Sequence, residues 1–360
     1  MLRRPRVDYI CPVTPSRDAN AAPSPTVTIV MTQRERFSPT QASLDSVYEN
    51  TVMPFEFIYV DGGSPLPIRN FLAERSAVYG FRHLRREHFL TQNEARNLAL
   101  GMVRSSHVCF LDNDVIAFPG WLERLVACAE ETGADVVGPL YGIHTRREGH
   151  RVHTTSGLFR STGRAGRRSY MYRLQNEGRP LEDPDLPRDR YRCEHVEFHC
   201  MLVSSALVRS IGGLDEGFRS SLDHVDLCLS AARAGAEIWS EPSAVVSYLQ
   251  PPPVTRTDLP FFMWRWSEAW NVADGRHFAA KWGFRSRYDH RIWVRYHRSL
   301  SYEWLPRAVI RLVGERLAIA LLAVTLFPVE SLGNRVLFRL LTRRQRARAE
   351  SGAALGPSGA

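Results

Sequence analysis

Short runs of β-branched and apolar residues alternate with helical stretches along the first half of the chain. The runs at 26–33 ("TVTIVMTQ"), 55–65 ("FEFIYVDGGSP") and 107–115 ("HVCFLDNDV") lack a helical period and are typical of buried strands. The intervening segments carry helix signals, such as Ser38 followed by Pro39 at a first helical position. This alternation predicts a doubly wound α/β sheet flanked by helices.

Acidic side chains stand at the ends of the second and third of these runs. Asp61 ends the second, and Asp112 and Asp114 end the third. Ligands of an open α/β sheet bind beyond the carboxyl ends of its strands, so we expect these three carboxylates to share one crevice. Oxygen ligands of this kind suit Mg2+ and Mn2+. Taken alone, however, Asp112-Asn113-Asp114 is also a common turn sequence.

The amino-acid composition changes several times along the 360 residues of the sequence. Residues 1–25 turn from basic to rich in Pro, Ser and Ala, which predicts a flexible leader. Residues 26–250 form the predicted main domain. Within it, Gly, Arg, Pro and Asp dominate 144–192, which favours a long, partly mobile insertion with limited regular structure. Residues 251–305 are aromatic-rich and predicted to be helical, and 306–360 form an amphipathic, basic tail.

The tail contains an apolar run from Leu317 to Phe327 with arginines on both sides. A bilayer crossing needs about 20 such residues, so this run is short for a transmembrane span. An interfacial helix on an anionic membrane fits the pattern. A buried helix followed by a basic tail fits it equally well. The sequence therefore leaves membrane contact open.

Charge and cysteine usage narrow the partners and the compartment. The formal net charge of +9 favours acidic lipid, a phosphorylated substrate or nucleic acid, and no nucleic-acid-binding motif is present. The six cysteines form no CxxC pair, and residues 1–25 lack the apolar core of a secretory signal. We therefore expect a cytoplasmic protein, bound peripherally to the inner face of the cell membrane if the tail is interfacial.

The order of the motifs resembles the inverting family 2 glycosyltransferases of the GT-A fold. The segments that carry the resemblance are, in chain order, "VTIVMTQRERF", "SLDSVYENT", "FEFIYVDGGSP", "NEARNLAL", "VCFLDNDVIAFPGWLERL", "GGLDEGF" and "DHVDLCLSAARAG". It covers roughly Thr26 to Tyr248. The resemblance implies a mixed GT-A sheet with a helical C-terminal extension. It also implies transfer of a sugar from a nucleotide-diphosphate donor, most often a UDP-sugar, with Mn2+ or Mg2+ as cofactor.

The resemblance assigns the donor side to residues after the second and before the third strand. Asp61 matches the acid that contacts the nucleotide base, although the family commonly has two acids where this chain has Asp61-Gly62. Asn93, Arg96 and Asn97 match the helix that flanks the nucleotide and its phosphates. Arg96 could equally be a solvated helix residue on sequence grounds.

The metal site is assigned to the acids of the third strand. Asp112 is expected to face the ribose and to assist the metal, and Asp114 is expected to bind the metal directly. Many relatives also have a metal-binding histidine after a later strand, but this chain reads "AVVSYLQ" at 244–250. The metal would then be bound by Asp114 and the diphosphate, either with lower affinity or with a different third ligand.

The acceptor side is assigned to "SLDHVDLCL" at 221–229, which matches the "EDxD" segment of the family. Inverting transfer needs one general base near the acceptor hydroxyl. Relatives place an acid where this chain has His224, so either His224 or the preceding Asp223 is the predicted base. Asp226 and His199 are expected on the acceptor side. The acids could also simply favour the start of a helix.

These assignments predict a metal-dependent hexosyltransferase that modifies a glycan, glycolipid or polysaccharide acceptor. Three arginines of the insertion, Arg164, Arg167 and Arg168, are expected to contact a phosphorylated or lipid-linked acceptor. A sugar nucleotidyltransferase is an alternative, disfavoured because "TQRERF" after the first strand has no glycine for a phosphate loop. A non-catalytic basic scaffold with a relic donor site is the other alternative.

Overall fold

The structure is a computed structural model of the whole chain. The residues that it describes are 8–9, 26–145, 149–162, 169–249, 254–286, 290–299, 301 and 304–354. Three arginines predicted to contact an acceptor, Arg164, Arg167 and Arg168, lie outside these ranges, as does most of the predicted leader.

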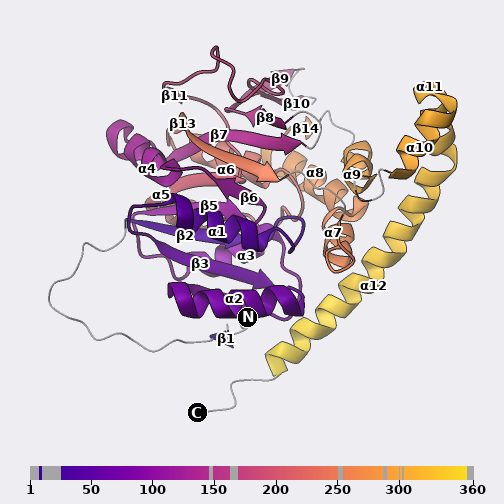
Figure 1. Cartoon of the computed structure of the whole chain (residues 1–360), viewed down its shortest axis with the longest axis horizontal. Coiled ribbons are helices and arrows are strands. Elements are labelled where there is room, and N and C mark those ends of the chain that lie inside the picture. The colour runs from indigo at the N-terminus through magenta and orange to yellow at the C-terminus, as the bar shows by residue number, and fades with distance from the viewer. Residues whose placement is uncertain are drawn as a thin grey trace.

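An eleven-stranded mixed sheet runs through the centre of the molecule (Figure 1). Its parallel half contains, in spatial order, β4 (Arg82–Arg86), β3 (Glu56–Gly62), β2 (Val27–Thr32) and β5 (His107–Asp112). The next strands are β12 (Cys200–Ser204), antiparallel to both its neighbours, then β7 (Val136–Thr145) and β13 (Ile238–Leu249), parallel to each other. The edges carry β1 (Asp8–Tyr9), β11 (Tyr191–Arg192), β6 (Val115–Ala117) and β8 (Gly149–Thr154). The predicted mixed, helix-flanked sheet is confirmed.

Helices cover both faces of this sheet because successive strand residues point to opposite sides. Ile29 belongs to one apolar core and the next residue, Val30, to the other. The Ile29 core is closed by α1 (Thr40–Asn50), α2 (Leu66–Tyr79) and α4 (Trp121–Thr132). The Val30 core is closed by α3 (Gln92–Leu100), α5 (Ser205–Ser210) and α6 (Asp223–Arg233). The sheet is therefore doubly wound.

The insertion at 144–192 is more regular than its composition suggests. Its described residues include β8, β9 (Gly157–Thr162) and β10 (Ser169–Leu174). β9 and β10 pair antiparallel in a second sheet that ends on β14 (Arg285–Ser286). The expectation of limited regular structure was wrong, because Gly and Arg between short alternating segments hid a strand period that cross-strand pairing satisfies.

Helices also make up the described C-terminal part of the chain. They are α7 (Leu259–Arg265), α8 (Glu268–Trp282), α9 (His290–Ser299), α10 (Trp304–Val313), α11 (Glu315–Val324) and α12 (Leu326–Ala354). α12 runs along the outside of the molecule (Figure 1) and is held where Leu341 packs with Trp264 and Trp270. Glu268 reinforces this packing through Ser331, 2.6 Å away, and Arg335, 3.3 Å away.

None of the described helices is both long and apolar enough to cross a membrane by itself. The one combination that has the length and composition is the pair Arg316–Val324 and Leu326–Ser351, which is bent by 42°.

Candidate functional site

The carboxyl ends of β2 and β5 meet the first turns of α3 and α6 at one edge of the sheet. A cavity of about 660 Å3 opens there, lined by residues of β5, α3 and α6 and by Arg34 just after β2. Those that the argument uses are Gln92, Asp112, His199, Asp223, His224 and Arg265. The structure therefore brings Asp112 of the predicted metal side and both predicted bases to one cavity, whereas Asp114 is fully buried and lines neither cavity.

Arg96 joins the two sides. Its guanidinium is 1% exposed and lies 3.2 Å from Asp112 Oδ1 and 2.7 Å from Asp223 Oδ2. The same group donates to Asn93 Oδ1 and stacks 3.8 Å from the centre of the Phe198 ring. Arg96 is thus a buried ion-pair centre rather than a solvated helix residue. It fixes the spacing between the acid at the end of β5 and the acid at the start of α6.

Replacing Arg96 with methionine is expected to destabilise the fold by about 3–5 kcal/mol, since it leaves two buried carboxylates without their shared partner. Lysine at this position is expected to recover only part of the loss, because one ammonium cannot reproduce the two-sided guanidinium contact. Urea unfolding measures the free energy of unfolding of both the methionine and the lysine variant. Arg104→Met is the control, as Arg104 is exposed and donates only to backbone carbonyls. A loss below about 1 kcal/mol for Arg96→Met would contradict the bridging role.

Asp112, Asp114 and His199 form a cluster with metal-ligand geometry. One ligand atom from each lies within 4.8 Å of the others, and all three residues are buried. Both carboxylate oxygens of Asp114 are buried without a hydrogen-bond partner, an arrangement that is costly unless a cation compensates it. Burial raises the pKa of Asp114 to about 6, against the opposing charge of Arg34. These residues therefore fit a divalent cation.

Glu197 orients His199 for this role. Nδ1 of His199 lies 3.4 Å from Asp112 Oδ2, and Nε2 lies 3.2 Å from Glu197 Oε2. A carboxylate behind a histidine ligand selects the tautomer that leaves the other nitrogen free for metal. Burial and the Arg34 charge oppose protonation, but the carboxylates on both sides raise the pKa of His199 to about 9. A bound cation would replace that proton.

Two further groups of potential ligands overlap this one along the same segment. They are His153 with Glu197 and His199, and His195 with Glu197 and His224. Glu197 already accepts from His153 at 3.1 Å, so the first group forms a satisfied network. Neither of these groups contains Asp114, the acid whose oxygens lack partners. The Asp112–Asp114–His199 cluster is therefore the best candidate metal centre among the described residues.

Sequence reasoning missed two arginines that border the cluster. Arg34, just after β2, lies 3.4 Å from Asp112 and 3.8 Å from Asp114, and its guanidinium sits 4.8 Å from the centre of the Tyr248 ring. Arg265, at the end of α7, donates to Gln92 Oε1 at 2.7 Å and to the Arg34 carbonyl at 2.9 Å. Arg34 belongs to the segment "TQRERF" that follows the first strand. No local pattern indicates Arg265, because its contact with Arg34 joins residues 231 positions apart.

The central residue of the tripeptide, Asn113, has a separate role. Its amide nitrogen donates to the Arg36 carbonyl at 2.7 Å and to Thr40 Oγ1 at 2.8 Å. Its oxygen accepts from the Arg34 backbone N–H at 3.0 Å. Asn113 therefore folds the loop after β2 over the end of β5, which is how Arg34 reaches the two aspartates.

At the start of α6, Asp223 and His224 are held next to each other. Nδ1 of His224 lies 3.4 Å from Asp223 Oδ1, while its buried Nε2 has no partner. Burial alone would raise the pKa of Asp223, but the contacts with His224 and Arg96 hold it far below its usual range. Leu222 before them has φ +66°, a conformation that costs a leucine roughly 1 kcal/mol or more. Strain of this kind clusters at functional sites.

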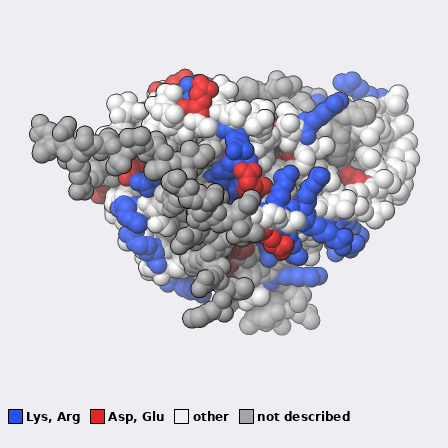
Figure 2. All heavy atoms as spheres, turned by 90° about the horizontal axis from the view of Figure 1, so that it is seen from below, with Lys and Arg blue, Asp and Glu red and all other residues white. Residues whose placement is uncertain are grey.

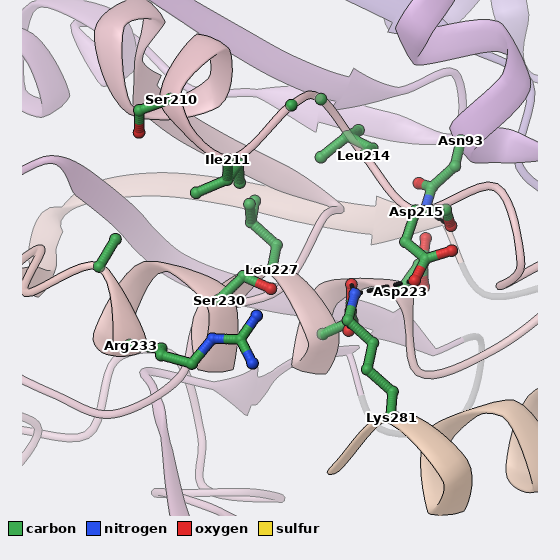
Figure 3. A pocket seen from close by; sticks show the side chains of 14 residues that line it. Asn93, Ser210, Ile211, Leu214, Asp215, Asp223, Leu227, Ser230, Arg233 and Lys281 are labelled. Carbon is green, nitrogen blue, oxygen red and sulfur yellow. Dashed lines mark hydrogen bonds and ion pairs between the residues drawn. The ribbon is translucent and has the colours of Figure 1, made fainter.

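Asp226 points to a second cavity, of about 510 Å3 (Figure 3). Lys281 lies 2.8 Å from both Asp226 and Asp215, and Trp282 Nε1 donates to Asp226 at 2.8 Å. Figure 3 shows Asp215, Asp223 and Lys281 on one side of this cavity and Arg233 on the other. Asp223 lines both cavities, whereas Asp226 lines only this one.

Two residues that were predicted on the donor side, Asp61 and Asn97, form hydrogen bonds with other residues of the chain. Asp61 accepts from the backbone N–H and hydroxyl of Ser64 at 2.8 Å each and from Arg85 at 2.5 Å. Burial opposes the shift, but these partners and His83 lower the pKa of Asp61. Asn97 exchanges hydrogen bonds of 2.8 and 2.9 Å with the backbone of Leu214. Neither Asp61 nor Asn97 lines either cavity.

The tryptophans of the aromatic-rich region 251–305 divide between the core and the larger cavity. Trp264 and Trp270 pack in the core under α12, as ordinary buried aromatics. Trp266 lines the larger cavity and stacks on His297 with ring centres 4.2 Å apart.

Comparison with solved structures identifies the fold class. The chain superimposes on the crystal structure of GalNAc-T7 with UDP, GalNAc and Mn2+ with a TM-score of 0.50 at 14% identity, over 73% of this chain and 51% of that one. The architecture therefore resembles the GT-A fold, as predicted.

Comparison of sequences agrees with the resemblance in the motifs. Residues 28–186, fewer than half of the chain, match the model of Glycosyl transferase family 2. The "Pre-mycofactocin glycosyltransferase" of Mycobacterium tuberculosis is 29% identical over 193 residues, 53% of this chain and 37% of the relative. The "Uncharacterized protein y4gI" of Sinorhizobium fredii is 25% identical over 223 residues, 60% of this chain and 24% of the relative. This chain thus spans well under half of these curated relatives.

Proposed function

We propose that the protein is a metal-dependent inverting glycosyltransferase that moves a hexose from a UDP-sugar to a hydroxyl of a glycan or glycolipid. The observation that carries the proposal is Asp114, a buried acid with two unpartnered oxygens beside Asp112 and His199. It lies at the end of β5, at the edge of the sheet where ligands of open α/β folds bind. The family 2 domain and the fold agree with this chemistry.

The charged residues around the cluster suit a diphosphate. Mn2+ or Mg2+, held by Asp114, Asp112 and His199, would offset the negative charge that develops on the leaving nucleotide. The guanidinium of Arg34 stands beside the same aspartates. Arg265 lines the cavity next to it. Planar guanidinium groups bind phosphate oxygens in pairs, so these two residues are our proposed phosphate contacts.

His224 is the proposed general base. It lines the cavity, its Nε2 is buried without a hydrogen-bond partner, and Asp223 holds Nδ1. In the reaction the acceptor oxygen forms its bond to the anomeric carbon as the carbon–oxygen bond to the diphosphate breaks. Nε2 takes the acceptor's hydroxyl proton in the same step. Asp223 is a poor proton acceptor because its carboxylate is already paired with Arg96.

Nucleotide binding tests this proposal directly. UDP with Mn2+ is expected to raise the melting temperature, because a ligand at about 100 times its Kd stabilises the folded state by about 2.7 kcal/mol. The shift should shrink with EDTA and with uridine in place of UDP. A screen of GDP, CDP and ADP identifies the base if UDP is inactive. Absence of any shift with all four diphosphates at millimolar concentration would overturn the donor-site assignment.

A further inference from the structure

Exposed apolar side chains are concentrated on the last three helices. Among the described residues, fifteen large hydrophobic side chains are exposed, and ten of these belong to α10, α11 and α12. They are Ile310, Leu312, Val313, Leu317, Leu321, Val324, Val329, Leu332, Val336 and Leu340. Monomeric proteins rarely leave so many in one region, and such surfaces usually bind a partner or a membrane.

On α12 these side chains form a stripe that faces away from the protein. Four of them follow at spacings of three or four residues, which places them on one face of the helix: Val329, Leu332, Val336 and Leu340. The buried residues of α12 lie on the opposite face, as Ser331, Asn334, Leu341 and Gln345. Asn334 donates to the Met263 carbonyl and Gln345 accepts from the Phe89 N–H. Because the inner face is already bound, the outer stripe has no partner within the described chain.

Positive charge accompanies this stripe. Residues 304–354 contain nine arginines and three glutamates, so they carry +6 of the chain's formal +9. Arg343 and Arg344 continue the helical face of Val336 and Leu340 after the apolar part ends, and Arg348, one turn further, is also exposed. Figure 2 shows a group of blue side chains beside a broad white area, on the side where Figure 1 places α10–α12. An apolar stripe that runs into arginines matches the boundary between lipid tails and anionic headgroups.

We propose that α10–α12 bind the protein peripherally to an anionic lipid bilayer, which goes beyond the proposed sugar transfer. A second copy of the chain is a poorer occupant, because a two-fold contact would bring the +6 segments of both copies together. A full crossing is disfavoured because no single described helix meets its length and hydropathy. Peripheral binding places α12 at the lipid surface, while its inner face stays on α7, which ends at Arg265 in the cavity.

Vesicle co-sedimentation of the full-length chain tests the proposal without any sugar donor. Vesicles of phosphatidylcholine with about 30% phosphatidylglycerol are expected to bind the protein at least about 10-fold more tightly than pure phosphatidylcholine, with the difference shrinking as salt is raised. Equal binding to both vesicle types, or binding to neither, would overturn the proposal. The result is independent of the proposed function, since the protein could bind lipid and fail to bind UDP, or the reverse.

Paired variants localise the binding. Leu332→Glu with Leu340→Glu, and separately Arg344→Glu with Arg348→Glu, are each expected to weaken binding to the anionic vesicles by about 10-fold or more. Leu66→Glu with Val78→Glu is the matched control, because these residues are 65% exposed on α2. Unchanged melting temperatures show that the variants are folded. Full binding by both α12 variants, or a dimer in sedimentation velocity that the leucine variant abolishes, would reject lipid as the occupant.

Discussion

Asp114→Asn is expected to abolish metal-dependent release of UDP from a UDP-sugar. The substitution keeps the shape of the side chain but removes the charge of the one acid, among the described residues, whose two oxygens are both buried without a hydrogen-bond partner. Loss of metal stabilisation of the leaving group is worth several kcal/mol, and about 4 kcal/mol corresponds to a 1,000-fold fall in kcat. Release of UDP at increasing Mn2+ concentration measures the effect. Asp45→Asn is the matched control, since Asp45 is a partly exposed acid on α1.

Stability separates this loss from misfolding. Without metal, a buried carboxylate that accepts no hydrogen bond destabilises the folded state, so Asp114→Asn is expected to be at least as stable as the unmodified protein. Burial raises the pKa of Asp114 to about 6 in the folded protein, whereas the pKa of this group in the unfolded chain has its ordinary value near 4. The metal-free protein should therefore lose stability as pH rises from about 4 to 6, and the variant should lose less. If Asp114→Asn still released UDP, we would instead assign the metal to one of the other two groups, which contain Glu197 and histidines.

The parts of the site that sequence predicts best are those fixed by local pattern. The strands ending at Asp61 and Asp112 were readable from apolar runs, because buried parallel strands tolerate little else. Parallel strands also share their carboxyl edge, so Asp112 and Asp114 could be placed at a crevice without coordinates. The same local reasoning placed Asp61 at a strand end. Its pairing with Arg85 depends on the neighbouring strand β4, which the local pattern does not show.

The parts that sequence did not predict depend on contacts between distant segments. His199 was expected near the acceptor, yet the antiparallel β12 places it beside Asp112, because Cys200 pairs with Leu111. This supplies an imidazole at the cluster, whereas residues 244–250 contain no histidine. Arg96 was uncertain as a single helix residue. Only the joint position of Asp112 and Asp223 makes it a bridge.

His224→Gln is the second substitution with a large expected effect. Glutamine preserves a polar side chain but cannot accept the acceptor proton, so kcat is expected to fall by about 100- to 10,000-fold. UDP–Mn2+ binding should be unchanged, because His224 is not part of the Asp112–Asp114–His199 cluster. His107→Gln is the matched control, at the opposite end of β5 from Asp112.

Asp223→Asn decides between the two predicted bases. If His224 is the base, this variant keeps a residual activity, because the imidazole remains while its orientation is less well fixed. It should also lower stability, since Arg96 loses its 2.7 Å partner. If Asp223 is the base, Asp223→Asn loses transfer completely and His224→Gln retains most of it. The two variants together therefore show which side chain accepts the proton of the acceptor hydroxyl. Asp223 could accept it only by losing the negative charge that pairs with Arg96, the residue that joins Asp112 to Asp223.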